Sequence, residues 1–127
     1  MFKAVGVFSG FSVKDIKKAQ KFYADILGLK VEERKGMGLK LHLPGGGTVF
    51  VYPKDNHEPA TYTVLNLVVS DIDKAADALI EKGIKFEKYK GFGQDDKGIA
   101  HGKAANMGPD IAWFKDPAGN IMSILSD

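Results

Sequence analysis

Val13-Lys14-Asp15-Ile16-Lys17-Lys18-Ala19 recurs further along the chain as Val69-Ser70-Asp71-Ile72-Asp73-Lys74-Ala75, with Val, Asp, Ile, Lys and Ala in the same places. The offset is 71 − 15 = 56 residues, close to half of the 127-residue chain. After each copy the match resumes one residue out of step, so one of the two helices is predicted to be a residue longer than the other. A repeat of this period indicates two copies of one supersecondary unit.

The pattern of each copy predicts the unit. A stretch rich in β-branched and aromatic residues ends at Asp15 or Asp71, a preferred helix N-cap, and helix-spaced apolar residues follow until Gly28 or Gly83. The predicted strands are residues 5–12, 30–34, 38–43 and 48–52 in the first copy, and 62–69, 85–90, 111–115 and 120–125 in the second. The fold class is therefore α+β, with two tandem β-α-β-β-β modules of about residues 1–55 and 61–127. A short polar linker, residues 54–60, joins them within a single domain, 1–127.

Composition limits the functions that this chain can have. It contains no cysteine, which excludes thiolate nucleophiles, Cys-rich zinc sites and iron–sulfur clusters. The formal net charge is only +2 and the basic residues are scattered among acids, so no nucleic-acid partner is predicted. No apolar run approaches the ~20 residues of a membrane span, and no signal peptide is recognisable. We expect a cytoplasmic protein with no membrane partner.

Two glycine-rich stretches need an interpretation. Gly45-Gly46-Gly47 lacks the Lys-Ser/Thr of a phosphate-binding loop and leads into a strand, so we predict a hairpin turn. Residues 91–110 form the longest irregular stretch, and the sequence leaves open whether they are a mobile lid or a plain connection.

The doubled unit resembles the vicinal oxygen chelate superfamily, which includes glyoxalase I, extradiol dioxygenases, and fosfomycin and bleomycin resistance proteins. Residues 13–29, ending Phe22-Tyr23-Ala24-Asp25-Ile26-Leu27-Gly28-Leu29, and residues 112–121, containing Asp116-Pro117-Ala118-Gly119-Asn120, are typical of that fold. The resemblance implies curled mixed sheets around a cavity that takes a small-molecule ligand. It also implies a homodimer, because most members pair.

Metalloenzymes of the superfamily hold a divalent ion through His and carboxylate side chains from both modules. Carried over residue by residue, the ligand positions fall on Phe8, Val64, Ser123, and either Val49 or Phe50. None of these is a useful ligand, so we predict no metal cofactor. The three histidines, His42, His57 and His101, share no spacing typical of a metal site, although one of them could serve as a general acid or base.

Side-chain alternation along the strands predicts the lining of the cavity. Of Trp113 and Phe114, which alternate across one strand, one must face the cavity, and we assign Trp113 to it. Asn66 and Ser123 are the polar groups on this wall, which is predicted to carry no charge. The predicted cavity residues are Phe8, Phe50, Tyr62, Val64, Asn66, Trp113, Ile121 and Ser123.

These residues favour metal-independent binding of a small, largely apolar molecule. The alternative is an enzyme, a glyoxalase-type lyase or isomerase or a dioxygenase, that uses an atypical metal site or a metal-free acid–base group. A third possibility is a module whose cavity is filled by its own side chains and which binds another protein. The sequence identifies neither a ligand nor catalytic residues.

Overall fold

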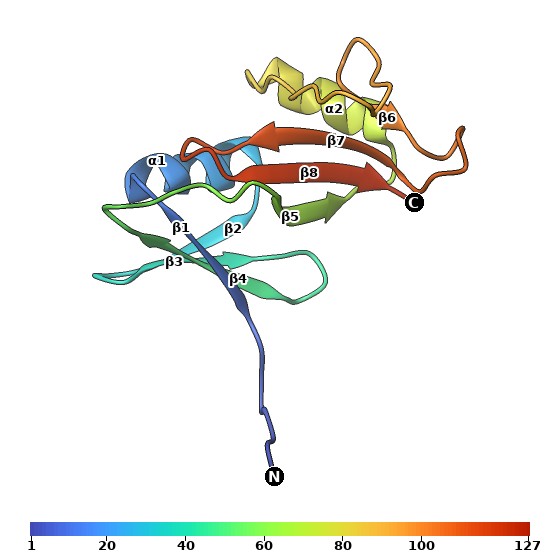
Figure 1. Ribbon diagram of the computed structural model, residues 1–127. Coiled ribbons are helices and arrows are strands. Elements are labelled where there is room, and N and C mark those ends of the chain that lie inside the picture. Colours follow the sequence, from blue (N-terminus) through green and yellow to red (C-terminus); the bar gives the residue numbers. More distant parts are fainter. The chain divides into compact units, whose positions relative to one another are not determined.

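The computed structural model describes all residues from Met1 to Asp127 (Figure 1). They divide into two compact units, Met1–Glu58 and Pro59–Asp127, which are described separately below. The boundary lies inside the polar stretch 54–60.

The first unit is a four-stranded mixed sheet with one helix. Its strands lie in the order β1-β4-β3-β2; β1 and β4 are parallel, and the other neighbours are antiparallel. The elements are β1 (Ser9–Val13), α1 (Ile16–Lys21), the π-helical segment η1 (Phe22–Ile26), β2 (Lys30–Arg34), β3 (Gly38–His42) and β4 (Thr48–Pro53).

The second unit repeats this arrangement with the strand order β5-β8-β7-β6. Its elements are β5 (Thr63–Val68), α2 (Ile72–Glu81), β6 (Ala100–His101), β7 (Asp110–Lys115) and β8 (Ile121–Ser126). Figure 1 shows α2 lying along β7 and β8, which it contacts. The predicted fold class, two tandem α+β modules with mixed sheets, is confirmed.

Both helices begin at the predicted caps. The Asp15 side chain accepts hydrogen bonds from the N–H groups of Lys17 and Lys18, and Asp71 accepts one from Lys74. Gly28 and Gly83 follow the helices with φ of 67° and 94°, the left-handed conformation that glycine adopts most readily.

The single-residue mismatch between the copies is a π-helical turn. In η1 the N–H of Leu27 bonds to the carbonyl of Phe22, five residues back, instead of the four of an α-helix. The same offset continues at the exit, because Leu29 bonds six residues back to Tyr23 whereas Ile84 bonds five residues back to Leu79. The extra residue of the first helix is thus accommodated as a bulge.

Each sheet has a helix face and an open face, and the two carry alternate residues of every strand. In the first unit Leu39, Leu41 and Val51 on the helix face are at most 1% exposed and form the core with Tyr23. In the second unit the fully buried helix-face residues are Ala112, Phe114, Met122 and Ile124. The open face is the opposite side of each sheet.

The predicted strand over residues 85–90 is wrong. Its backbone makes one bond to the sheet, from the N–H of Glu87 to the carbonyl of Trp113 at 2.8 Å. The Gln94 side chain supplies two further partners: its Nε2 donates to the Glu87 carbonyl at 2.8 Å, and its Oε1 accepts from the N–H of Tyr89 at 2.6 Å. A side-chain amide therefore replaces ladder bonds, and β6 takes the fourth place in the sheet.

The predicted first strand began too early. Ser9 pairs with Val49, near the start of β4, so earlier residues have almost no partner strand to bond to. Residues 1–8 are exposed, and Figure 1 shows them running away from β1. No helix of the chain combines the length and apolar character needed to cross a bilayer.

Candidate functional site

The open face of the second sheet brings three predicted cavity residues into one row. Asn66 pairs with Ser123 across β5 and β8, and Ser123 pairs with Trp113 across β8 and β7. The fully buried Ser123 hydroxyl donates a 2.5 Å hydrogen bond to Oδ1 of Asn66. The Asn66 residue is exposed, and its Nδ2 makes no hydrogen bond within the protein. The Nδ2 amide group of Asn66 is therefore an unpaired donor at the end of this row of residues.

The indole of Trp113 is the centre of an aromatic cluster. The ring centroid of Phe92 lies 4.9 Å from it and that of Tyr89 lies 5.6 Å from it, both edge-on. The Tyr89 hydroxyl is buried and has no hydrogen-bond partner. Burial, with a smaller contribution from Glu87, raises the pKa of the Tyr89 phenol above 10, so at neutral pH it keeps its proton and can donate.

Sequence reasoning missed Tyr89 and Phe92. Tyr89 lies within the segment that was predicted to be a strand and Phe92 follows it. The signal available was only three aromatic residues, Phe86, Tyr89 and Phe92, spaced three apart. Their contact with Trp113 depends on the loop path that Gln94 fixes. Phe114 is fully buried on the helix face against Phe86, and Trp113 lies on the opposite, open face.

The other predicted cavity residues of the second unit do not follow a strict alternation along the strands. Ile121 is half-buried and pairs with Thr63, because the register of β5 shifts between Thr63 and Leu65. Val64 is the extra residue of this bulge, which breaks the strict alternation that placed Tyr62 in the cavity. Tyr62 precedes β5 and is 69% exposed.

The open face of the first sheet holds a pocket of about 320 Å³ beside Phe50. Phe8 reaches it although 68% of Phe8 is exposed. Arg34 and Lys40 also line it, so the expected absence of charge is wrong for this face. The reason is register: Lys40 lies between Phe50 on β4 and Glu32 on β2, and alternation puts all three on one side.

Glu32 is the partner of two basic side chains on this face. Its carboxylate bonds to Nε2 of His42 at 3.1 Å and to Nε of Arg34 at 3.2 Å. The hydrogen bond from His42, helped by the positive charge of Arg34, lowers the pKa of Glu32. A histidine–carboxylate pair therefore stands next to Thr48, which pairs with His42 and lines the pocket.

The family model of the Glyoxalase/Bleomycin resistance protein/Dioxygenase superfamily matches residues 7–124, almost the whole chain. This chain belongs to that superfamily. A comparison with curated protein sequences finds no match.

Solved structures share the superfamily fold at low sequence identity. TnmS3, an antibiotic binding protein from Streptomyces sp. CB03234, has a TM-score of 0.66 at 21% identity, with 98% of each chain covered. A superfamily member from Sphaerobacter thermophilus DSM 20745 has a TM-score of 0.65 at 23% identity, covering 97% of this chain and 98% of that one. The fosfomycin resistance protein FosX from Listeria monocytogenes has a TM-score of 0.68 at 13% identity, covering 100% and 95%.

The superfamily's divalent metal does not fit the residues at the corresponding positions. Phe8 and Val64 have no donor atom, nor has Val49 or Phe50, and the Ser123 hydroxyl is engaged with Asn66. The three histidines have separate partners: His42 bonds to Glu32, His57 Nδ1 lies 2.6 Å from the Ser12 hydroxyl, and His101 bonds to Asp95. No three His, Asp or Glu side chains of the chain converge on one point.

The segment 94–101 beside the aromatic cluster is held by Asp95. Its Oδ1 accepts from the N–H groups of Lys97, Gly98 and Ile99 at 2.9 to 3.1 Å, and its Oδ2 lies 2.7 Å from Nε2 of His101. The hydrogen bond to Asp95 raises the pKa of His101. Burial raises the pKa of Asp95, but the bonds from His101 and the backbone outweigh it, and the pKa is lowered overall.

These hydrogen bonds of Asp95 predict that the stability of segment 94–101 depends on pH. The raised pKa of His101 stabilises the folded segment below 6.5, its ordinary value, and the effect is lost as pH rises through the folded-state pKa. The lowered pKa of Asp95 stabilises it above 3.8 and is lost as pH falls through the folded-state pKa. We expect the Ile99 amide to show its highest hydrogen-exchange protection between these values, after correction for intrinsic exchange. His101→Gln should remove the fall in protection above pH 6.5. An unchanged fall would show that the hydrogen bond between His101 and Asp95 is not its cause.

Proposed function

We propose that this chain binds a small, largely apolar molecule on the open face of its second sheet, without a divalent metal. The observation that carries this is the Tyr89 hydroxyl, buried against Trp113 without a partner. A buried hydroxyl with no hydrogen bond costs about 1–3 kcal/mol, and a ligand that supplies an acceptor recovers that free energy.

The surroundings of Tyr89 indicate the shape and polarity of the ligand. Trp113 is half-buried and Phe92 is 53% exposed, so both have ring surface left for a flat apolar group. The free Nδ2 of Asn66 supplies a second donor on the same face. The ligand class is therefore a flat apolar molecule with oxygen acceptors. The printed name of TnmS3, an antibiotic binding protein of the same fold, is consistent with a binding role.

The test uses the single tryptophan of the chain, Trp113, as the reporter. 2-Acetylnaphthalene, a flat ring with a carbonyl acceptor, should quench its fluorescence in a saturable way. Tyr89→Phe should weaken binding by roughly 5- to 150-fold, the equivalent of about 1–3 kcal/mol. Asn66→Leu should weaken it within the same range.

Three controls sharpen the result. 2-Ethylnaphthalene, which has no acceptor, should bind Tyr89→Phe as well as it binds the original chain. Asn56→Leu, on an exposed loop of the first unit, should change nothing. The affinity should persist in excess chelator. Equal affinity of 2-acetylnaphthalene for the original chain and Tyr89→Phe, or loss of binding in chelator, would count against the proposal.

A glyoxalase-type lyase or isomerase, or a dioxygenase, is the second candidate function, and the His42–Glu32 pair beside the 320 Å³ pocket favours it. A hydrogen-bonded imidazole and carboxylate can move a proton without a metal. In that case His42→Ala or His101→Ala would abolish a turnover that Asn66→Leu only slows.

We also propose that the chain is a homodimer. Each sheet ends in an edge strand within its own unit, β1 and β2 in the first and β5 and β6 in the second. Edge strands present unpaired backbone groups, and two-fold pairing is the commonest way to cover them. Sedimentation at micromolar concentration should give a species of twice 13.8 kDa. A monomer under those conditions would contradict the proposal.

A further inference from the structure

Residues 1–8, which we call the arm, carry a continuous exposed apolar surface. Phe2, Val5 and Val7 are each at least 90% exposed, and Phe8 is 68% exposed. Single apolar residues on a surface are ordinary, but a contiguous run of them marks an interaction site. Ser9 is the first residue that pairs with β4, and Figure 1 shows the arm running away from β1. The first sheet therefore leaves the arm without a partner strand.

The arm has the sequence of a strand that is buried on both sides. Residues 4–8 are Ala-Val-Gly-Val-Phe and contain no polar side chain. Alternate residues of a strand face opposite sides, so Ala4 and Phe8 share one side while Val5 and Val7 share the other. Strands that are apolar on both sides are normally covered on both sides within a sheet. The composition of the arm therefore calls for a neighbouring strand that its own sheet does not supply.

The edges of the two sheets differ in how well they are protected against such an addition. Four of the five residues of β2 are charged, and β6 has only two residues. Charge and short length are two ways in which natural sheets block pairing at an edge. The edge strand β1 contains Gly10, which weakens a strand. The edge strand β5 has six residues without a charge or a glycine, and its Val68 is 71% exposed, so it is the most open edge.

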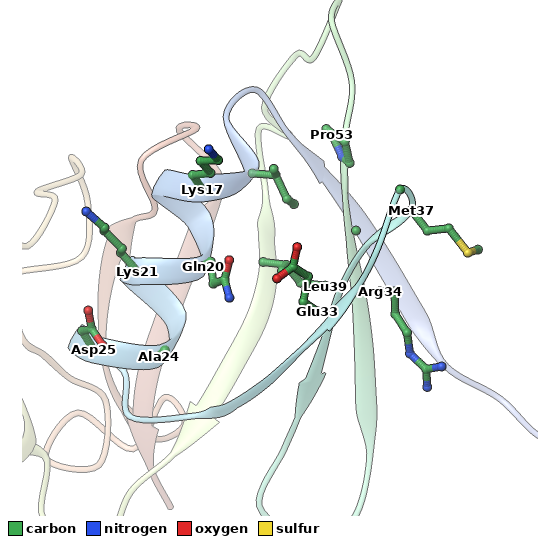
Figure 2. Close-up of a pocket in the computed structure, with 13 residues that line it drawn as sticks. Lys17, Gln20, Lys21, Ala24, Asp25, Glu33, Arg34, Met37, Leu39 and Pro53 are labelled. Carbon is green, nitrogen blue, oxygen red and sulfur yellow. The ribbon is translucent and has the colours of Figure 1, made fainter.

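The groove between α1 and the β2–β3 hairpin, of about 640 Å³, is a poor alternative place for the arm. Figure 2 shows Lys17 and Asp25 on its helix side and Glu33 on its hairpin side. An apolar segment laid into this groove would remove water from charged groups of both signs without offering them hydrogen bonds, which is costly.

We propose that the arm adds as a strand to the β5 edge of a second copy of this chain. The inference rests on the homodimer proposed above and states what holds that dimer together. Two-fold symmetry makes each copy both donor and acceptor, so both arms are buried and both β5 edges are covered.

The area available suits a specific interface. A phenylalanine can bury about 150–250 Å², and two arms bring Phe2 and Phe8 twice, together with Val5 and Val7 twice. The exchange therefore buries on the order of 1,000 Å², the area above which a specific contact is expected.

The double variant Val5→Lys, Val7→Lys tests the arm by sedimentation. It keeps the length of the chain and leaves Phe8, which lines the 320 Å³ pocket, in place. We expect the dissociation constant of the dimer to rise at least about 100-fold, because four valines per dimer lose their apolar contacts. The far-ultraviolet circular dichroism should stay unchanged, since the altered residues lie outside every strand and helix.

Two further variants are the matched controls. Val5→Ile, Val7→Ile keeps the arm apolar and should remain dimeric. Met107→Lys makes the same apolar-to-lysine change on a loop of the second unit, where Met107 is 84% exposed, and should also remain dimeric.

Hydrogen exchange identifies the edge that receives the arm. The amides of residues 1–8 and those of β5 that do not bond to β8 should be protected together at concentrations where the chain is dimeric. Both sets should lose protection on dilution and in Val5→Lys, Val7→Lys, whereas the amides of β2 should not respond.

The outcomes separate this inference from the homodimer itself. A dimer that persists in Val5→Lys, Val7→Lys would overturn the arm exchange and leave the homodimer standing, whereas a monomeric original chain would contradict both. Protection of the arm at concentrations where the chain is monomeric would mean that its own second unit covers it, and this too would overturn the inference. So would protection that appears in β1 instead of β5.

Discussion

Gly38→Ala should destabilise the protein by at least about 3 kcal/mol, the largest loss we expect from a single methyl group. Gly38 begins β3 at the end of the β2–β3 hairpin, with φ of 151°. A Cβ there would lie 2.3 Å from the carbonyl oxygen of Val51 and 3.1 Å from Cα of Tyr52. Both contacts are with backbone, so the strands themselves would have to separate. Urea unfolding followed by circular dichroism measures the free energy of unfolding.

Gly36→Ala is the matched control in the same hairpin. Gly36 also has a positive φ, 77°, but a Cβ there would meet nothing within 4 Å. Only left-handed strain remains, which costs roughly 1 kcal/mol. If Gly36→Ala and Gly38→Ala lost equal stability, the close approach of β3 to β4 would not be the cause.

Asp116→Ala should cost about 2–4 kcal/mol, because it leaves buried donors without an acceptor. Asp116 is 5% exposed and Asn120 is 2% exposed. Oδ1 of Asp116 accepts from the N–H groups of Ala118 and Asn120 at 2.9 Å, and Oδ2 accepts from Nδ2 of Asn120 at 3.0 Å. This one carboxylate closes the β7–β8 turn. The free energy of unfolding is again the measurement.

Two substitutions test that explanation. Asp15→Ala removes a carboxylate that accepts two backbone bonds at an exposed helix N-cap, and should cost only about 1 kcal/mol. Asp116→Asn keeps one acceptor oxygen but sets two amide groups against each other, and should fall between the two alanine variants. A loss in Asp116→Ala no greater than that in Asp15→Ala would show that burial of the turn contributes nothing.

Most of the fold could be predicted because its signals are local. The N-caps Asp15 and Asp71, the stops at Gly28 and Gly83, and the turn at Asp116 each act within a few residues. The one-residue mismatch between the repeats also predicted that one helix is a residue longer than the other. Its form, a π-helical turn ending at Leu27, was not, because an extra residue can be absorbed in several ways.

One prediction failed where a nearby side chain competes for backbone hydrogen bonds. Residues 85–90 have strand composition, but Gln94 satisfies Glu87 and Tyr89 in place of a neighbouring strand. The alternation predicted from Tyr62 to Asn66 was wrong because β5 contains a bulge. One extra residue in a strand reverses the face on which the residues before it lie. Neither the hydrogen bonds of Gln94 nor the bulge of β5 can be recognised from the alternation of apolar and polar residues.

The sequence by itself determined the doubled α+β unit, the positions of its helices and hairpins, and the absence of His and carboxylate side chains at the positions that correspond to the superfamily's metal ligands. All of these depend on residue type and short spacing. Only the tertiary structure decided which polar groups are left without partners. The Tyr89 hydroxyl is unpaired because the loop closes it against Trp113. Whether a polar group is satisfied depends on residues far away in the chain, and those distances arise only when the strands pair and the loops close.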